Sequence, residues 1–260
     1  MLSLSLARRG DTGDAMSRFS LAAQAGAHPL HLVRPCDTCK AREFSACAPL
    51  TAEEQKRLVA IMRTVSVEPH HSIFDEADPA EYVYNVTEGT VKVYKLLGDG
   101  RRQITGFLFA GDFLGLTHNE SYAYSAEALA PTALCRFPRR KLEALLDEMP
   151  SLEQRLLAMA SHELAAAQDQ MMLLGRKSAR ERVVSFMLML SNSAARHGRP
   201  TDPEFLPMSR SDIADYLGLT IETVSRTLTR LRKQGLIELL DEKHVRLSRL
   251  SELREIAEGF

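Results

Sequence analysis

The sequence lacks any apolar run close to the roughly 20 residues that a membrane-spanning helix needs. A short apolar stretch lies within residues 1–10, but Arg8 and Arg9 follow it, whereas the basic residues of a signal peptide come first. These features predict a cytoplasmic protein without a membrane partner.

Cysteine is scarce, with four in 260 residues. Inside the cell, so few thiols are more often metal ligands or reactive groups than disulfides. The sequence also lacks a Ser/His/Asp set, a phosphate-binding loop and a His-rich metal centre. We therefore expect no enzyme, with a Cys-ligated iron–sulfur or zinc enzyme as the alternative from a different class.

Net charge is also low, at −1, which excludes a uniformly basic nucleic-acid-binding protein. The charge is unevenly distributed, because residues 176–260 contain 15 Lys and Arg against 12 Asp and Glu. A local basic surface in the C-terminal part is therefore compatible with this composition.

The composition changes along the chain and predicts five segments of an α+β protein. Residues 1–30 are rich in Ala, Ser and Gly and are expected to form a mobile tail. Residues 31–49 form a cysteine-rich segment, and residues 50–150 open with a helix capped by Thr51. Short apolar runs separated by turn signals then predict an antiparallel β-roll or jelly roll.

The next segment, residues 151–177, reads as one long helix with Ser151 as its N-cap. Apolar residues recur along it at spacings of three and four, which indicates a seam that pairs two copies of the chain. A second stripe of Leu152, Leu156 and Met159 is available to face the roll. The alternative is a helix packed only on its own β-domain. The predicted dimerisation residues are Leu157, Ala160, Leu164, Ala167, Met171 and Leu174.

Residues 178–260 have the pattern of a winged helix-turn-helix. Ser209 caps a first helix, Gly218 supplies the turn, and Thr220 caps a second helix. Two short apolar strands follow as a wing. An ordinary helical hairpin with a solvated face is the alternative, but the caps, the turn glycine and the hairpin together favour DNA binding.

The second helix buries one face and leaves a polar face outward. Arg donates bidentately to guanine, Glu accepts from cytosine, and Ser, Thr and Lys contact phosphates. Two paired copies would read a palindrome in double-stranded DNA with half-sites about one helical turn apart. The predicted DNA-binding residues are Thr220, Glu222, Thr223, Ser225, Arg226 and Arg230.

Three cysteines, Cys36, Cys39 and Cys47, stand within twelve residues, and Cys135 follows at what reads as the end of the last strand of the roll. Thiolates bind zinc and iron–sulfur clusters alike. The single close pair fits zinc less well than a cluster, and unliganded thiols are the third possibility.

The order of these segments resembles the CRP/FNR superfamily of bacterial transcription regulators over residues 34–250. The stretch Gly-Leu-Thr-Ile-Glu-Thr-Val-Ser-Arg at 218–226 is similar to the recognition helix of the oxygen-responsive FNR branch. The stretches at 103–107 and 110–112 resemble the FNR β-roll. A cyclic-nucleotide site is disfavoured, since Asp112 follows Gly111 and Tyr124 stands where that branch has a phosphate-binding Arg.

This resemblance implies that Cys36, Cys39, Cys47 and Cys135 hold a 4Fe–4S cluster, with zinc as the runner-up. It also implies that Glu222, Ser225 and Arg226 read a TTGAT-type half-site, and that the cluster promotes dimerisation and DNA binding at low oxygen. The expected partners are palindromic DNA, a second copy and RNA polymerase, contacted through loops such as residues 98–100. A regulator that binds DNA without a cluster, or with another signal, is the alternative within the class.

Two departures from the FNR pattern are visible. Seven residues separate Cys39 from Cys47, which resembles FnrN-type regulators, and Ala167 replaces an acidic residue of the familiar dimer helix. The sequence leaves open the oxygen sensitivity, the strictness of monomer–dimer switching, the signal (oxygen or nitric oxide), the regulated genes, and activation versus repression.

Overall fold

The computed structural model describes residue 36 and residues 39–259; the tail predicted at 1–30 and most of residues 31–38 lie outside the described residues. The helices are η2 (Arg42–Phe44), α1 (Ala52–Ile61), α2 (Arg139–Leu146), α3 (Pro150–Arg176), α4 (Ala179–Arg196), α5 (Arg210–Leu217), α6 (Ile221–Lys233) and α7 (Leu250–Glu258). The strands are β1 (Arg63–Val67), β2 (Ser72–Phe74), β3 (Tyr82–Glu88), β4 (Thr90–Leu96), β5 (Arg102–Phe109), β6 (Phe113–Leu114), β7 (Ser125–Ala128), β8 (Thr132–Pro138), β9 (Glu204–Phe205), β10 (Ile237–Leu239) and β11 (His244–Leu247).

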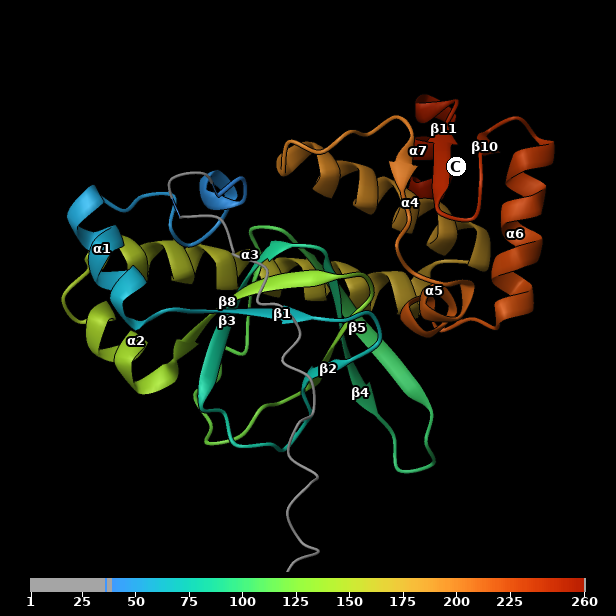
Figure 1. The fold of residues 1–260 in the computed structure, drawn as a ribbon. Helices are drawn as coiled ribbons and strands as arrows, with labels where there is room; N and C mark the ends of the chain where they lie inside the picture. Colours follow the sequence, from blue (N-terminus) through green and yellow to red (C-terminus); the bar gives the residue numbers. More distant parts are fainter. Residues whose placement is uncertain (1–35, 37–38, 260) are drawn as a thin grey trace, which may run out of the picture. The chain divides into compact units, whose positions relative to one another are not determined.

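The predicted antiparallel β-roll is confirmed (Figure 1). In the described chain it consists of two sheets with strand orders β1-β8-β3-β6 and β2-β7-β4-β5. Inward-facing side chains such as Val86, Val91, Leu114 and Leu134 pack between the sheets. Strands β4 and β5 form a long hairpin that extends beside α5, and its turn begins at Leu97.

The predicted N-terminal cap is confirmed for α1 and is wrong for α3. Thr51 caps α1 through a capping box with Glu54, as predicted. The expected cap at Ser151 is wrong, because α3 already begins at Pro150, whose fixed φ suits the first helical position. Ser151 lies inside the first turn, and its hydroxyl donates to Glu54 Oε1 over 3.1 Å.

The long helix α3 runs from beside α2 to α5, where Gln170 donates to the Tyr216 carbonyl (Figure 1). Leu152 and Leu156 are buried against α1, α2 and the roll, and Met159 packs against the same apolar cluster. The predicted second stripe therefore faces the roll. The helix ends one residue after Gly175.

The predicted winged helix-turn-helix is confirmed. Ser209 and Thr220 cap α5 and α6, and Gly218 adopts φ 61° at the turn, which a residue with a Cβ rarely does. The proline-rich stretch 197–207 contains β9, which pairs with β11. Helix α7 has no counterpart in the sequence prediction and packs on α4.

Among the described residues, no helix combines the length and apolar character that crossing a membrane requires.

Candidate DNA-reading surface and cysteine site

The outward face of α6 is open to solvent. Val224, Leu228 and Leu231 anchor the helix in the C-terminal core, so the intervening residues point away from it. An open hollow along this face is lined by Ser225, Arg226, Thr229, Arg230 and Lys233. A row of donors on an exposed helix suits the major groove of DNA.

The first turn of α6 carries the other predicted DNA-binding residues. Thr220 Oγ1 accepts a hydrogen bond from the Thr223 N–H over 3.2 Å. Glu222 is exposed, and a backbone hydrogen bond at the helix start, aided by Thr220 and the Arg226 charge, holds the pKa of its carboxyl below the usual value. Glu222 is therefore an ionised acceptor at neutral pH.

Arg182 of α4 fixes the helix-turn-helix relative to the end of α3. Its guanidinium donates to the carbonyls of Leu174 (2.8 Å), Lys177 (2.9 Å) and Leu217 (2.9 Å). These carbonyls belong to the last turn of α3, the link to α4 and the last turn of α5. One half-buried guanidinium thus joins three segments through charge-assisted hydrogen bonds.

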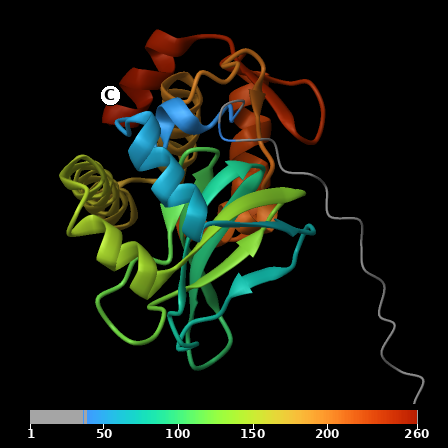
Figure 2. The same ribbon diagram turned by 60° about the vertical axis from the view of Figure 1, so that its left-hand side comes forward.

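The apolar seam of α3 faces solvent in the single chain. Leu157, Leu164 and Met171 are 68%, 61% and 64% exposed, and Ala160 and Ala167 are exposed beside them. Figure 2 views α3 obliquely along its axis, at the edge of the described chain. Leu174 differs, because it is partly buried and packs against the C-terminal core. An uncovered apolar stripe of this length is typical of a protein–protein interface.

Two of the predicted cysteine ligands, Cys47 and Cys135, contact one apolar cluster although they are 88 residues apart in sequence. Cys135 occupies the middle of β8, opposite Thr64 of β1 and Asn85 of β3, and not the strand end that the sequence predicted. Cys47 packs against the same apolar cluster as Cys135. The Cys39 N–H donates to the Cys36 carbonyl over 3.3 Å.

Burial and mutual repulsion disfavour the thiolates. Burial, together with the charges of Cys36, Cys47 and Cys39, raises the pKa of Cys135 to about 12. Burial also raises the pKa of Cys47, opposed by a Ser45 hydrogen bond and assisted by Cys36 and Cys39. Four thiols that sense one another's charge need a bound cation before all can ionise.

The described residues contain no group of three His, Cys, Asp or Glu side chains close enough to hold one metal ion. A ready-made tetrahedral zinc site is therefore missing from this part of the chain. A 4Fe–4S cluster makes a different demand, because each thiolate binds a separate iron at a corner of the cube. The four cysteines are partly buried, and two of them, Cys47 and Cys135, contact one apolar cluster, so as thiol donors they fit that group in chemistry.

The loop between Cys39 and Cys47 contacts other parts of the molecule. Arg155 of α3 donates to the carbonyls of Phe44 (2.9 Å) and Ser45 (3.2 Å). The Phe44 ring lies 5.7 Å from that of His197, which caps the end of α4. A Cβ at Gly111 would stand 2.9 Å from Phe44 Cβ, so glycine permits this close approach.

The interior of the roll is filled by aromatic side chains. Phe74 and Tyr122 stack with ring centroids 3.8 Å apart, and the Tyr122 hydroxyl donates to the Tyr82 carbonyl over 2.7 Å. The Gly115 N–H donates to the Tyr124 hydroxyl over 3.0 Å. Asp112 accepts from the Phe109 N–H and lies 3.4 Å from His197 Nε2. These carboxylate and ring positions suit packing better than binding of a phosphate.

The buried carboxyl of Glu204, on β9, should make the stability of the protein depend on pH. The residue is 1% exposed, and burial raises its pKa to about 7, against the opposing effects of Arg199 and Ser191. Folding therefore favours the protonated carboxyl, a contribution that is complete below the ordinary pKa and is lost as pH rises through 7. Glu204→Gln should raise the free energy of unfolding by about 2–3 kcal/mol at pH 8 and change it little near pH 4.5.

Urea unfolding between pH 4.5 and 8 measures this difference. Glu238→Gln is the matched control, because Glu238 is exposed on β10 and pairs with Arg246. A stability gain that is equal at both pH values would show that the Glu204 charge is not responsible.

Several contacts around these sites could not be predicted from the sequence. Arg155, Arg182 and His197 act through backbone carbonyls and ring packing, which leave no periodic or spacing signal. Lys92, buried at 3% exposure in β4, also went unnoticed. The sequence does contain a signal for Lys92, because a lysine flanked by valines in a strand is expected to face either solvent or a partner charge.

Comparison with known proteins agrees with this architecture. The model of the cyclic nucleotide-binding domain matches residues 64–149, and that of bacterial regulatory proteins of the crp family matches residues 206–237. The nitrogen fixation regulation protein FixK of Bradyrhizobium diazoefficiens is 42% identical over 205 residues, covering 79% of this chain and 86% of FixK. The transcriptional activator protein FnrL of Cereibacter sphaeroides is 34% identical over 230 residues, covering 87% and 93%.

Among solved structures, FixK2 from Bradyrhizobium japonicum superposes with a TM-score of 0.71 at 40% identity, covering 75% of this chain and 97% of FixK2. The likeness extends over the roll, the long helix and the helix-turn-helix together.

Proposed function

Because the chain belongs to the CRP/FNR family of DNA-binding bacterial transcription regulators, we propose that it senses oxygen through a 4Fe–4S cluster held by Cys36, Cys39, Cys47 and Cys135. In this proposal the loaded chain pairs through α3 and binds a TTGAT-type palindrome when oxygen is low. Such a cluster, when bound, supplies an oxygen-labile link between the cysteine loop and β8.

The observation that supports this proposal is the gathering of four thiols from two distant parts of the chain. Cys47 and Cys135 share one apolar cluster, and Cys36 and Cys39 act electrostatically on both.

Contacts of the cysteine loop suggest how its position reaches the DNA-reading end. Arg155 ties the loop carbonyls to α3, whose opposite face carries the exposed seam. Phe44 rests on His197 at the end of α4, and α4 packs against α6. A loop held against β8 therefore supports both α3 and the C-terminal domain, and a released loop supports neither. This difference in free energy is what a switch between two states requires.

Purification without oxygen tests the cofactor directly. We expect a coloured protein with about four iron and four sulfide per chain. Zinc in place of iron would support the runner-up metal. A colourless preparation with neither metal would contradict the cluster, and it would favour regulation without one.

Regulation without a cluster is the second candidate function. Identity to FixK, at 42%, exceeds identity to FnrL, at 34%, and FixK is named for nitrogen fixation regulation. A regulator that binds DNA without a cluster, or with another signal, would use the same α6 face and α3 seam. Retention of iron by the four cysteines separates the two proposals.

Activation is the proposed regulatory outcome. FnrL of Cereibacter sphaeroides and Anr of Pseudomonas aeruginosa are both named transcriptional activators. The turn of the β4–β5 hairpin is exposed, with Leu96 and Leu97 at 58% and 44%. Exposed apolar side chains on a projecting hairpin suit contact with a partner such as RNA polymerase.

Arg226→Ala tests the DNA-reading assignment. Loss of a bidentate contact to guanine should weaken specific binding by about 1–3 kcal/mol and relax the preference at one base pair. Affinity for matched and substituted operators, measured by fluorescence anisotropy, reports both effects. Arg232→Ala is the control, because Arg232 is exposed on the same helix but off the outward face. An unchanged base preference in Arg226→Ala would remove this residue from the readers.

A further inference from the structure

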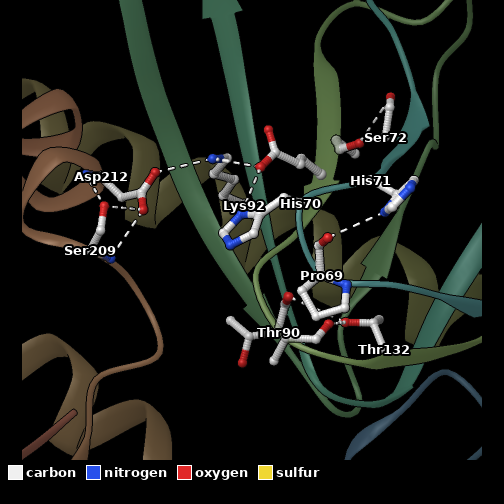
Figure 3. Close-up of polar contacts among 12 residues, drawn as sticks. Pro69, His70, His71, Ser72, Thr90, Lys92, Thr132, Ser209 and Asp212 are labelled. Carbon is white, nitrogen blue, oxygen red and sulfur yellow. Dashed lines mark hydrogen bonds and ion pairs between the residues drawn. The ribbon is translucent and has the colours of Figure 1, made fainter. Parts of the chain in front are cut away.

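A set of charged side chains joins the β-roll to the helix-turn-helix. Lys92 of β4 places its Nζ 2.9 Å from Glu127 Oε1 of β7 and 3.1 Å from Asp212 Oδ1 of α5. Figure 3 shows Lys92 pointing out of the roll toward Asp212. The side chains of Lys92 and Asp212 are 4% and 6% exposed, so this ion pair lies out of contact with water.

Arg102 of β5 adds a second connection. Its Nη2 lies 2.8 Å from Asp215 Oδ2 and 3.3 Å from Asp212 Oδ1. Asp212 and Asp215 are three residues apart on α5 and therefore project from the same side of that helix. We call the set of Lys92, Arg102, Glu127, Asp212 and Asp215 the domain bridge. It includes two residues of α5 that lie about one helical turn apart.

Asp212 also completes the N-terminal cap of α5. Its Oδ2 accepts from the Ser209 N–H (3.0 Å) and the Ser209 hydroxyl (2.6 Å), while its Oδ1 faces Lys92 (Figure 3). The same Oδ1 also accepts from Arg102. Burial alone would raise the pKa of Asp212, but the Ser209 hydrogen bonds and the Lys92 charge hold it below the usual value. The start of α5 and the domain bridge therefore depend on one ionised carboxylate.

A buried bridge of this kind fixes an arrangement more than it adds net stability. Desolvation of Lys92 and Asp212 offsets most of their attraction, whereas the low-dielectric surroundings penalise any orientation that separates them. Gln103 and Gln170 reinforce the arrangement, because both donate to the Tyr216 carbonyl, over 3.2 and 2.7 Å. Helix α5 is thereby held to the roll and to α3.

The domain bridge does not cover the DNA-reading face. Arg226 and Arg230 line an open hollow on α6, and the bridge contacts α5 instead. An autoinhibitory contact would occupy the reading residues. The arrangement held by the bridge is therefore one in which α6 is free to enter a groove.

We propose that Lys92 and Arg102 are positioning residues for DNA recognition, which hold α5, and through it α6, at one orientation relative to the roll. In a pair of chains this would set the separation of the two recognition helices and so the half-site spacing that the protein accepts. The inference rests on the proposed pairing through α3 and is independent of the cluster.

The test compares operators that differ only in the spacer between half-sites. The operator is first selected from a random duplex library by the unaltered chain, and its spacer is then lengthened or shortened by one and two base pairs. Each added base pair rotates one half-site relative to the other, so the unaltered dimer should lose affinity on the order of tenfold or more. A flat response of the unaltered chain would overturn the pairing itself.

Lys92→Met and Arg102→Ala remove the bridge from the roll side. Both should bind the selected operator on the order of tenfold more weakly and lose only about two- to threefold more when the spacer changes, because a loosened α5 tolerates other separations. Arg102→Lys should keep most of the spacing preference. If Lys92→Met does not fold, Arg102→Ala still decides the matter, because Arg102 is 26% exposed at the edge of the bridge.

Two matched controls carry similar changes outside the bridge. Lys95 lies on β4 and pairs with Glu76 on the surface of the roll over 2.8 Å, and Arg101 pairs with Asp99 within the hairpin over 2.8 Å. Lys95→Ala and Arg101→Ala should match the unaltered chain at every spacer. An equal loss of affinity at all spacers would show that the bridge variant has only lost folded protein, and it would overturn the positioning role. A dependence of affinity on spacer length like that of the unaltered chain would overturn it as well.

Discussion

A chain carrying Cys135→Ser is expected to leave an oxygen-free purification with little iron and to bind its operator about 5- to 150-fold more weakly, the usual range of coupling between two sites. Cys135 lies in the middle of β8, between β1 and β3, so its backbone is held by two neighbouring strands. Serine replaces one atom and leaves this pairing intact. The loss would therefore concern the ligand and not the fold.

Ala133→Ser is the matched control for this change. Ala133 lies two residues earlier on β8 and is half-buried like Cys135, so the same hydroxyl is added to the same face of the strand. Iron content and operator affinity should match those of the unaltered chain. Full iron retention by Cys135→Ser would remove this residue from the ligand set.

Leu164→Glu is expected to abolish pairing of two chains and to reduce operator affinity by about 10²- to 10⁴-fold, since each half-site then binds its own monomer. Leu164 is 61% exposed in the single chain, at the centre of the predicted seam. In a pair of chains it meets an apolar face, where a carboxylate loses its water without gaining a partner. Exposure in the monomer also means that glutamate leaves the folding of one chain unaffected.

Ala165→Glu adds the same charge one residue later, at an exposed position that points about 100° away around the helix. Sedimentation velocity of the loaded protein should show a monomer for Leu164→Glu and a dimer for Ala165→Glu. A dimer in both variants would place the interface elsewhere.

The architecture of the C-terminal domain could be predicted from the sequence because its signals are local. The side chains of Ser209 and Thr220 cap helices by accepting from the backbone N–H three residues later, and Gly218 supplies the left-handed turn within the same short stretch. Each of these residues acts on its immediate neighbours, so the order of residue types carries the information.

Features that depend on distant partners could not be predicted in the same way. Pro150 displaced the expected Ser151 cap, and Ser151 instead bonds Glu54 of α1, 97 residues away. Strand β9 forms in a proline-rich stretch because β11 offers it a free edge. The pairing of Lys92 with Asp212 joins residues 120 apart, and no periodicity connects them.

The candidate cysteine site lies between these two cases. The close spacing of Cys36, Cys39 and Cys47 indicates three ligands, and the family resemblance implies Cys135 as the fourth ligand. Only the register of β8 with β1 and β3 places Cys135 in mid-strand beside the apolar cluster that Cys47 also contacts. Strand register is a tertiary property, which explains why the sequence located this residue at the strand end.

Oxygen-dependent operator binding is the central claim, and one preparation can test it. Operator affinity is measured on oxygen-free protein, the same sample is exposed to air, and the measurement is repeated with iron and sulfide determined at both points. We predict loss of iron together with a fall in affinity of about 5- to 150-fold. Equal affinity before and after air, or an oxygen-free sample that binds fully without iron, would contradict the account.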